Sequence, residues 1–186
     1  MHVSVAILPP ERIRTDIAEL VGSVLGGDPE LERVTADAMR LRLFGLGNLT
    51  RLDVDALCEN LARQISEIGV RPRIHLAGVW ALEDSADPSI ALHVAGDTAG
   101  VVTLANALPP LVMAHGFFVD RRLFVPRVTV ARVTDATSVK VLERLVKALE
   151  GYRSPEWEVD AVDVISPVRR DGTGAFETVY SLATSR

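Results

Sequence analysis

The order of predicted elements repeats within the chain, and this repeat constrains the fold more than any other feature. From a strand near Arg40 the order is strand, helix, strand, strand. The same order starts again from a strand near Arg127, an offset of 87 residues (127 minus 40). The repeat predicts an α+β fold with two pseudo-symmetric lobes, each a small antiparallel sheet with helices on its outer face. A central groove should separate the lobes.

Hydrophobic periodicity and turn residues place the predicted elements along the chain. Strands are expected at residues 3–8, 38–44, 71–79, 89–95, 124–133, 157–165 and 175–183. Helices are expected after Pro9-Pro10, at 53–68, from about Asp97, and at 137–149. The Pro109-Pro110 pair should end or kink the third helix, because proline removes a backbone donor and clashes with the preceding turn. Residues 170–174 (RDGTG) are typical of a hairpin turn.

Composition narrows the class of protein. The 186 residues, of which 48% are hydrophobic and 24% charged, predict one folded bilobal domain spanning residues 1–186. No apolar run is long enough for a membrane span, and the N-terminus has no leader pattern, so we expect a cytoplasmic protein. The single cysteine, Cys58, excludes an intramolecular disulfide. The net charge of −5 argues against duplex DNA as a partner.

Strand alternation predicts a cationic face in this acidic protein. Successive side chains point to opposite faces of a strand, and the helices should cover the apolar face. The other face then collects seven polar or cationic side chains: Arg40, Arg42, Arg73, His75, His93, Arg127 and Thr129. A solvated sheet face would show the same pattern at any one of these positions. Two matching strands that both carry arginine favour a groove that binds phosphate, because guanidinium binds its oxygens bidentately.

Two segments resemble the signatures of the 2H phosphoesterases, the superfamily of bacterial 2'-5' RNA ligases and cyclic phosphodiesterases. Residues 124–133 (FVPRVTVARV) resemble the second signature, Phe-x-Pro-His-hydrophobic-Thr-hydrophobic-Ala-Arg, with Arg127 in place of its histidine. Residues 38–49 (AMRLRLFGLGNL) resemble the first signature, usually His-hydrophobic-Thr, with Arg40 and Arg42 in place of both polar residues. Similarities also occur at residues 3–11, 74–97 and 117–121, so the resemblance covers the whole chain.

The resemblance implies a phosphate site in which only Thr129 keeps the family's residue type. In the family the two histidines act as general base and acid, and the threonines hold the phosphate. Histidine can exchange a proton near neutral pH, whereas arginine stays protonated and cannot accept one. We therefore expect a cationic groove that binds a phosphorylated small molecule, a nucleotide or an RNA end without two-histidine catalysis. The predicted ligand-binding residues are Arg40, Arg42, Arg73, Arg127 and Thr129.

Two other interpretations stay open at this point. An active phosphodiesterase or RNA ligase could use His93 or His75 as relocated acid–base groups, since both fall on the groove-side face. Alternatively, the protein could be an interaction module whose groove is closed by its own loops or by a partner. Four scattered histidines with no close-spaced pair are poor metal ligands, so we expect neither a metal nor a cofactor.

Overall fold

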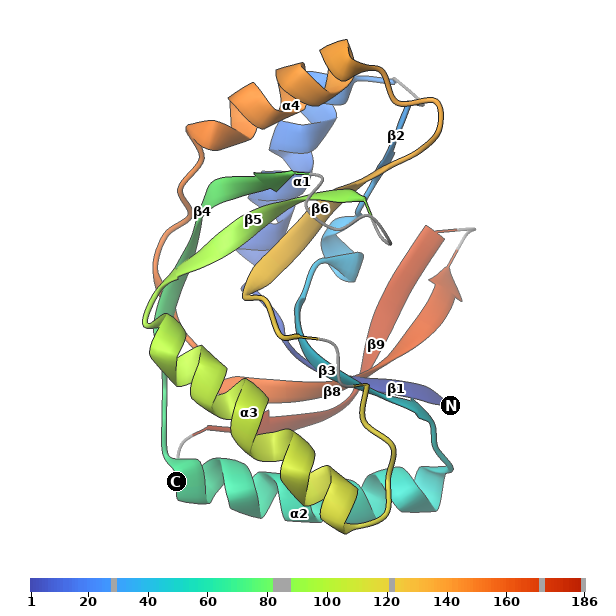
Figure 1. Ribbon diagram of the computed structural model, residues 1–186, viewed down its shortest axis with the longest axis vertical. Helices are drawn as coiled ribbons and strands as arrows, with labels where there is room; N and C mark the ends of the chain where they lie inside the picture. The colour runs from blue at the N-terminus through green and yellow to red at the C-terminus, as the bar shows by residue number, and fades with distance from the viewer. Residues whose placement is uncertain (28–29, 82–87, 121–122, 171–172, 185–186) are drawn as a thin grey trace.

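The computed structural model describes residues 1–27, 30–81, 88–120, 123–170 and 173–184 (Figure 1). The helices are α1 (Glu11–Leu25), α2 (Arg51–Ile68), α3 (Thr98–Ala114) and α4 (Val139–Glu150), with the short 3-10 turn η1 (Ala36–Ala38). The strands are β1 (His2–Ile7), β2 (Leu31–Arg33), β3 (Leu41–Asn48), β4 (Arg73–Ala81), β5 (Ser89–Gly96), β6 (Arg127–Val133), β7 (Trp157–Glu158), β8 (Ala161–Arg170) and β9 (Thr173–Ala183).

The strands form two antiparallel sheets, which confirms the predicted two-lobed α+β fold. One sheet has the order β3-β1-β8-β9 and the other the order β2-β6-β5-β4-β7. Each sheet takes strands from both halves of the chain, so the sequence repeat does not divide the molecule into consecutive lobes. This interleaving brings β3, which begins directly after Arg40, into contact with β6, which begins at Arg127.

Helices cover the outer face of each sheet (Figure 1). Helices α2 and α3 pack on each other and contact β9 and β3, respectively, while α1 and α4 pack together against the other sheet. Helix α4 packs on its sheet through one apolar face, on which Val141, Leu145 and Leu149 recur at helical spacing and are buried. A capping box of Thr50 and Asp53 starts α2 by satisfying backbone donors of its first turn.

Three local predictions need correction or limits. Residues 38–40 lie outside β3, because η1 occupies the chain up to residue 38 and the strand begins only at Leu41. Helix α3 does not end at Pro109-Pro110 but continues to Ala114, since Leu108 and Val112 on either side of the prolines are fully buried and hold the segment in place. The predicted hairpin turn at 170–174 falls partly on residues 171–172, outside the described residues.

None of the helices in the described ranges is long and apolar enough to cross a membrane. The buried apolar side chains of both sheets and all four helices form one cluster, which fixes the two sheets relative to one another. The face of each sheet opposite its helices is therefore held in a defined position, and the candidate site lies there.

Candidate anion-binding cleft

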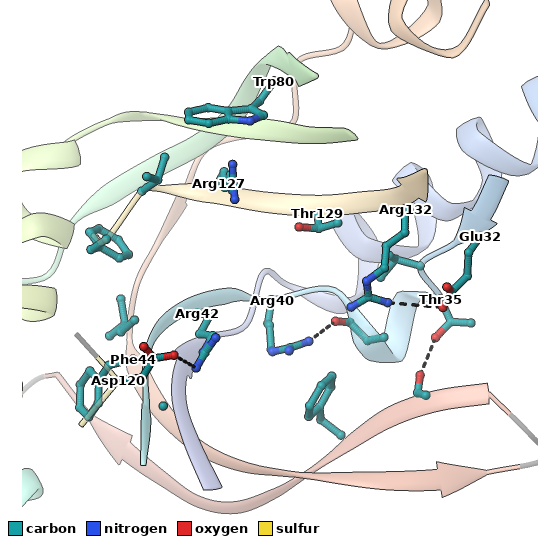
Figure 2. A pocket seen from close by; sticks show the side chains of 18 of the residues that line it. Glu32, Thr35, Arg40, Arg42, Phe44, Trp80, Asp120, Arg127, Thr129 and Arg132 are labelled. Carbon is teal, nitrogen blue, oxygen red and sulfur yellow. Dashed lines mark hydrogen bonds and ion pairs between the residues drawn. The ribbon is translucent and has the colours of Figure 1, made fainter. Parts of the chain in front are cut away.

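A cleft of about 820 Å³ opens between the two sheets. Arg40 and Arg42 line it from the β3 side, and Arg127 and Thr129 line it from β6 (Figure 2). On β6, the neighbouring Val128 is fully buried, so strand alternation directs the polar side chains into the cleft. The structure thus brings together four of the five residues predicted to bind a ligand.

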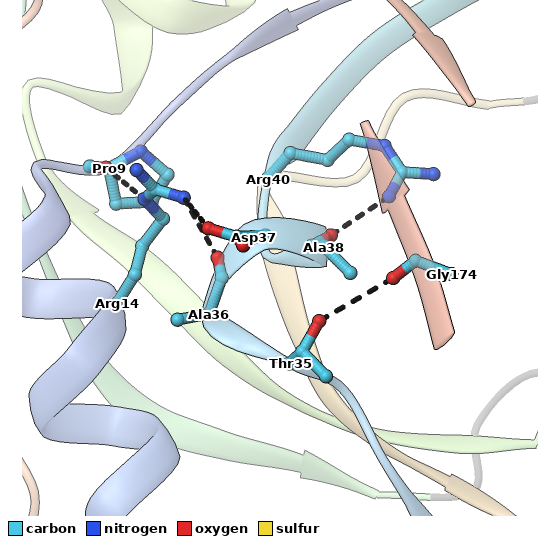
Figure 3. A network of polar contacts seen from close by, with 8 residues as sticks. All are labelled: Pro9, Arg14, Thr35, Ala36, Asp37, Ala38, Arg40 and Gly174. Carbon is cyan, nitrogen blue, oxygen red and sulfur yellow. Dashed lines mark hydrogen bonds and ion pairs between the residues drawn. The ribbon is translucent and has the colours of Figure 1, made fainter. Parts of the chain in front are cut away.

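The backbone just before Arg40 is held from two sides (Figure 3). Arg14 of α1 donates a hydrogen bond of 2.9 Å to the carbonyl oxygen of Ala36 in η1. On the other side, the Thr35 hydroxyl donates to the Gly174 carbonyl oxygen of β9 at 3.5 Å. These contacts tie η1 to both a helix and a strand, and they set the point at which the side chain of Arg40 enters the cleft.

Arg40 is a largely buried cation without a carboxylate partner among the described residues. Its guanidinium lies 3.6 Å from the ring centroid of Phe176 and donates through Nη1 to the Ala38 carbonyl oxygen at 3.0 Å. Its Nε is buried and has no hydrogen-bond partner in the part of the chain that is described. Burial, and then the charges of Arg42 and Arg132, lower the pKa of Arg40 to about 10. The group therefore stays charged at neutral pH in a place that disfavours charge.

Arg42 is paired with an acid on the cleft wall. Its Nη2 lies 3.1 Å from Oδ2 of Asp120, and both side chains are about one-third exposed, at 37% and 27%. The Asp120 backbone N–H donates to the Gly45 carbonyl oxygen at 3.0 Å, which anchors the acid to β3. A carboxylate from the segment between α3 and β6 thus holds the Arg42 guanidinium to one side of the cleft.

Arg127 lies against an aromatic ring on the opposite wall. Its guanidinium carbon is 4.5 Å from the ring centroid of Trp80, which also lines the cleft (Figure 2). A cation over an aromatic face is attracted by the ring quadrupole. Neither Trp80 nor Phe176 could be assigned to an arginine from the sequence, because only the tertiary fold brings these rings from β4 and β9 to the arginines.

A fourth arginine, Arg132, also lines the cleft, and strand alternation alone would have placed it on the core face. In β6 the pairing with β5 shifts between Thr129 and Ala131, where an extra residue is inserted. Such a bulge reverses the alternation beyond it, so Val130 and Ala131 are both buried and Arg132 returns to the cleft face. Arg132 pairs with Glu32 at 3.4 Å.

The remaining predicted residues lie outside the cleft. Arg73 is at the far end of β4, where it pairs in register with Glu158 of the short strand β7. His75 is buried, and its Nδ1 lies 3.7 Å from Glu156 and has no hydrogen-bond partner among the described residues. His93 pairs in register with Arg127 and packs against Trp80 at a ring-centroid distance of 5.5 Å, but it does not line the cleft.

The charge of the cleft wall is strongly positive although the chain is acidic. Five arginines line it against two carboxylates, Glu32 and Asp120: the cations are Arg33, Arg40, Arg42, Arg127 and Arg132. Among the described lining residues there is no histidine, and the described ranges contain no cluster of His, Cys, Asp or Glu that could hold a metal ion. The lining therefore offers fixed positive charge and hydrogen-bond donors rather than groups that exchange protons near neutral pH.

Solved structures of other proteins share this architecture, although no sequence comparison detects a relative. No family model matches the sequence, and no curated protein matches it. Solved structures do: TT0787 of Thermus thermophilus has a TM-score of 0.71 at 19% identity, over 99% of this chain and 98% of that one. E. coli LigT complexed with NADP+ has a TM-score of 0.69 at 19% identity, over 100% and 98%. The chain has the LigT fold.

Other structures with this fold include one described as a phosphoesterase, with a TM-score of 0.70 at 20% identity over 100% of this chain and 99% of that one. LigT itself has also been solved in complex with 3'-AMP, with ATP and with phosphate. The likeness supports, at the level of fold, the resemblance to the 2H phosphoesterases read from the two signatures.

Proposed function

We propose that this protein binds a phosphate ester, carried by a nucleotide or an RNA end, in the cleft between its two sheets, and that it does so without two-histidine catalysis. The observation that carries the proposal is Arg40: a largely buried guanidinium with no carboxylate partner among the described residues.

An uncompensated buried charge is unfavourable in a folded protein. Buried ions are normally paired or fully hydrogen-bonded, because desolvation costs several kcal/mol per ion. Arg40 instead has an unpartnered Nε and two further cations close enough to lower its pKa. A phosphate bound between Arg40 and Arg127 would supply the missing negative charge and accept bidentate hydrogen bonds. Thr129, on the same wall as Arg127, would add a hydroxyl donor.

The ligands bound to proteins of this fold support the same chemistry. LigT structures hold NADP+, 3'-AMP, ATP or phosphate, all of which carry phosphate oxygens. In this chain the arginines lie on two opposite walls of the cleft, an arrangement that allows a phosphate group to be bound from both sides.

Proton transfer is the part of the family chemistry that the arginines do not support. A positioned acid or base contributes about 10²–10⁴-fold to a rate, and a guanidinium that stays protonated supplies no general base. His75 is buried near Glu156, and His93 lies beside Trp80 without lining the cleft, so neither supports a relocated acid–base pair. The open volume of about 820 Å³ likewise does not favour a groove closed by the chain itself.

Isothermal titration calorimetry with 3'-AMP at low salt tests the proposal. We expect saturable binding with a dissociation constant between about 1 µM and 1 mM, and weakening at higher salt because the site is cationic. The Arg63→Met variant, which removes an exposed arginine on α2, serves as the control and should bind as the wild type does. An absence of binding at millimolar ligand would overturn the proposal. The predicted cytoplasmic location stays a prediction.

A further inference from the structure

We infer that the cleft selects dianionic phosphate monoesters over monoanionic diesters and cyclic phosphates, and that Asp120 is the residue that sets this selectivity. The inference rests on the proposed function and names the ligand class of the same site. It is carried by the ion pair that occupies Arg42 on the cleft wall.

In the Arg42–Asp120 pair, the Asp120 carboxylate occupies the guanidinium for which a ligand anion would compete. The contact joins a single guanidinium nitrogen, Nη2, to a single carboxylate oxygen at 3.1 Å, and both side chains are partly exposed to the cleft. A partly exposed ion pair held by one such contact contributes little to stability, because solvent screens its charges. The pair can therefore be exchanged for a better anion without disrupting the fold.

Gly45 provides the space that makes this pair form. A β-carbon at position 45 would overlap the Arg42 guanidinium, so the glycine lets the side chain fold back along β3 toward Asp120. The same glycine accepts the backbone hydrogen bond from Asp120. The strand, the glycine and the acid together hold Arg42 at the side of the cleft.

The charge of the ligand then decides whether Arg42 is recruited. A phosphate monoester carries about two negative charges at neutral pH, because its second pKa is near 6, whereas a diester or a cyclic phosphate carries one. A monoanion is matched by Arg40 and Arg127 and offers Arg42 no more charge than Asp120 already does. A dianion offers more, so it displaces the carboxylate and gains a third guanidinium.

Three adenosine compounds separate charge from shape: 3'-AMP, 2',3'-cyclic AMP, and the 3'-methylphosphate diester of adenosine. Calorimetric titration at pH 7.5 should show wild-type protein binding 3'-AMP at least about tenfold more tightly than either monoanion, as one more charge near several guanidinium groups predicts. Lowering the pH from 7.5 to 5 should weaken 3'-AMP binding and leave the diester unchanged.

Variants test whether Asp120, acting through Arg42, sets the preference for monoesters. Asp120→Asn should strengthen binding of the two monoanions about three- to tenfold and so narrow the preference for 3'-AMP, because Arg42 no longer has a competing carboxylate. In an Arg42→Met background the same substitution should have little effect, since Asp120 acts through Arg42. Glu143→Gln, the same charge change on the exposed face of α4, should leave all three affinities unchanged.

The outcomes separate the two proposals. If 3'-AMP and the monoanions bind equally, or if Asp120→Asn strengthens binding just as much without Arg42, the selectivity inference is wrong while phosphate binding stands. If none of the three compounds binds, both proposals fail. Thermal unfolding of each variant shows that a loss of binding is not a loss of fold.

Discussion

The two walls of the cleft present arginine at matching positions of the sequence repeat, yet they hold it differently. Arg40 lies on Phe176 with a buried, unpartnered Nε, and burial lowers its pKa to about 10. Arg127 lies 4.5 Å from the centroid of Trp80, on a wall that also carries Thr129. Residues related by the repeat thus differ in how much their charge costs the unliganded protein.

This difference indicates on which wall a bound anion would change the stability of the protein most. Both guanidinium groups lie on an aromatic ring, so what sets Arg40 apart is its buried, unpartnered Nε, and a ligand phosphate would relieve that desolvation. The β3 wall should therefore couple binding to stability strongly, and the β6 wall should contribute affinity with little effect on the free protein.

Replacing Arg40 by methionine should weaken 3'-AMP binding by roughly 10- to 100-fold, the size expected for losing a charge-assisted bidentate contact. The same change should stabilise the unliganded protein by about 1–2 kcal/mol, because it removes a buried unpaired charge and keeps an apolar stem on Phe176. Calorimetry and chemical denaturation measure the two effects. Weaker binding with lower stability would contradict the account, and Arg63→Met is the matched control.

Replacing Arg127 by methionine should weaken 3'-AMP binding by about tenfold and leave the unliganded protein no more stable than the wild type. The informative quantity is the difference in stability change between Arg127→Met and Arg40→Met. A stability gain as large as that of Arg40→Met would show that the two walls are equivalent.

Replacing Thr129 by valine should weaken 3'-AMP binding by about three- to tenfold, because one hydroxyl donor to phosphate is lost and the shape is kept. Calorimetry should show the loss for 3'-AMP. Equal affinities for the variant and the wild type would remove Thr129 from the site.

A pH series should distinguish the stability of wild type and Arg40→Met. Because the pKa of Arg40 is lowered in the folded state to about 10, the unfolded chain binds that proton more tightly. The charge therefore destabilises the wild type fully below pH 10, and this penalty is lost as the pH rises above 10 toward the higher pKa of the unfolded chain. Denaturation at pH 8 and at pH 10.5 should show the advantage of the methionine variant shrinking. A constant difference would contradict the assigned cause.

Much of this site could be predicted from the sequence, because the residues that form it lie in short segments with a recognisable pattern. Arg40, Arg42, Arg127 and Thr129 lie in two short segments whose pattern could be read directly, and the repeat predicted that these segments face one another. Arg132 was missed because a single inserted residue in β6 reverses the alternation, and no nearby glycine or proline marks it.

Other features depend on tertiary packing and had no local signal. Asp120, Trp80 and Phe176 reach the arginines from distant parts of the chain, so their roles appear only once the two sheets are placed. The same holds for Arg73 and His75, which strand alternation puts on the predicted face but which lie far along β4 from the cleft, beside β7 and Glu156.

Phosphorus NMR of one sample containing 3'-AMP and 2',3'-cyclic AMP reports phosphate binding and turnover in a single experiment. We predict that the 3'-AMP resonance shifts on addition of protein while the integral of the cyclic phosphate resonance stays constant over hours. An unshifted 3'-AMP resonance would contradict phosphate binding in the cleft. Conversion of the cyclic signal into monoester, absent from a heat-denatured sample, would contradict the loss of acid–base catalysis.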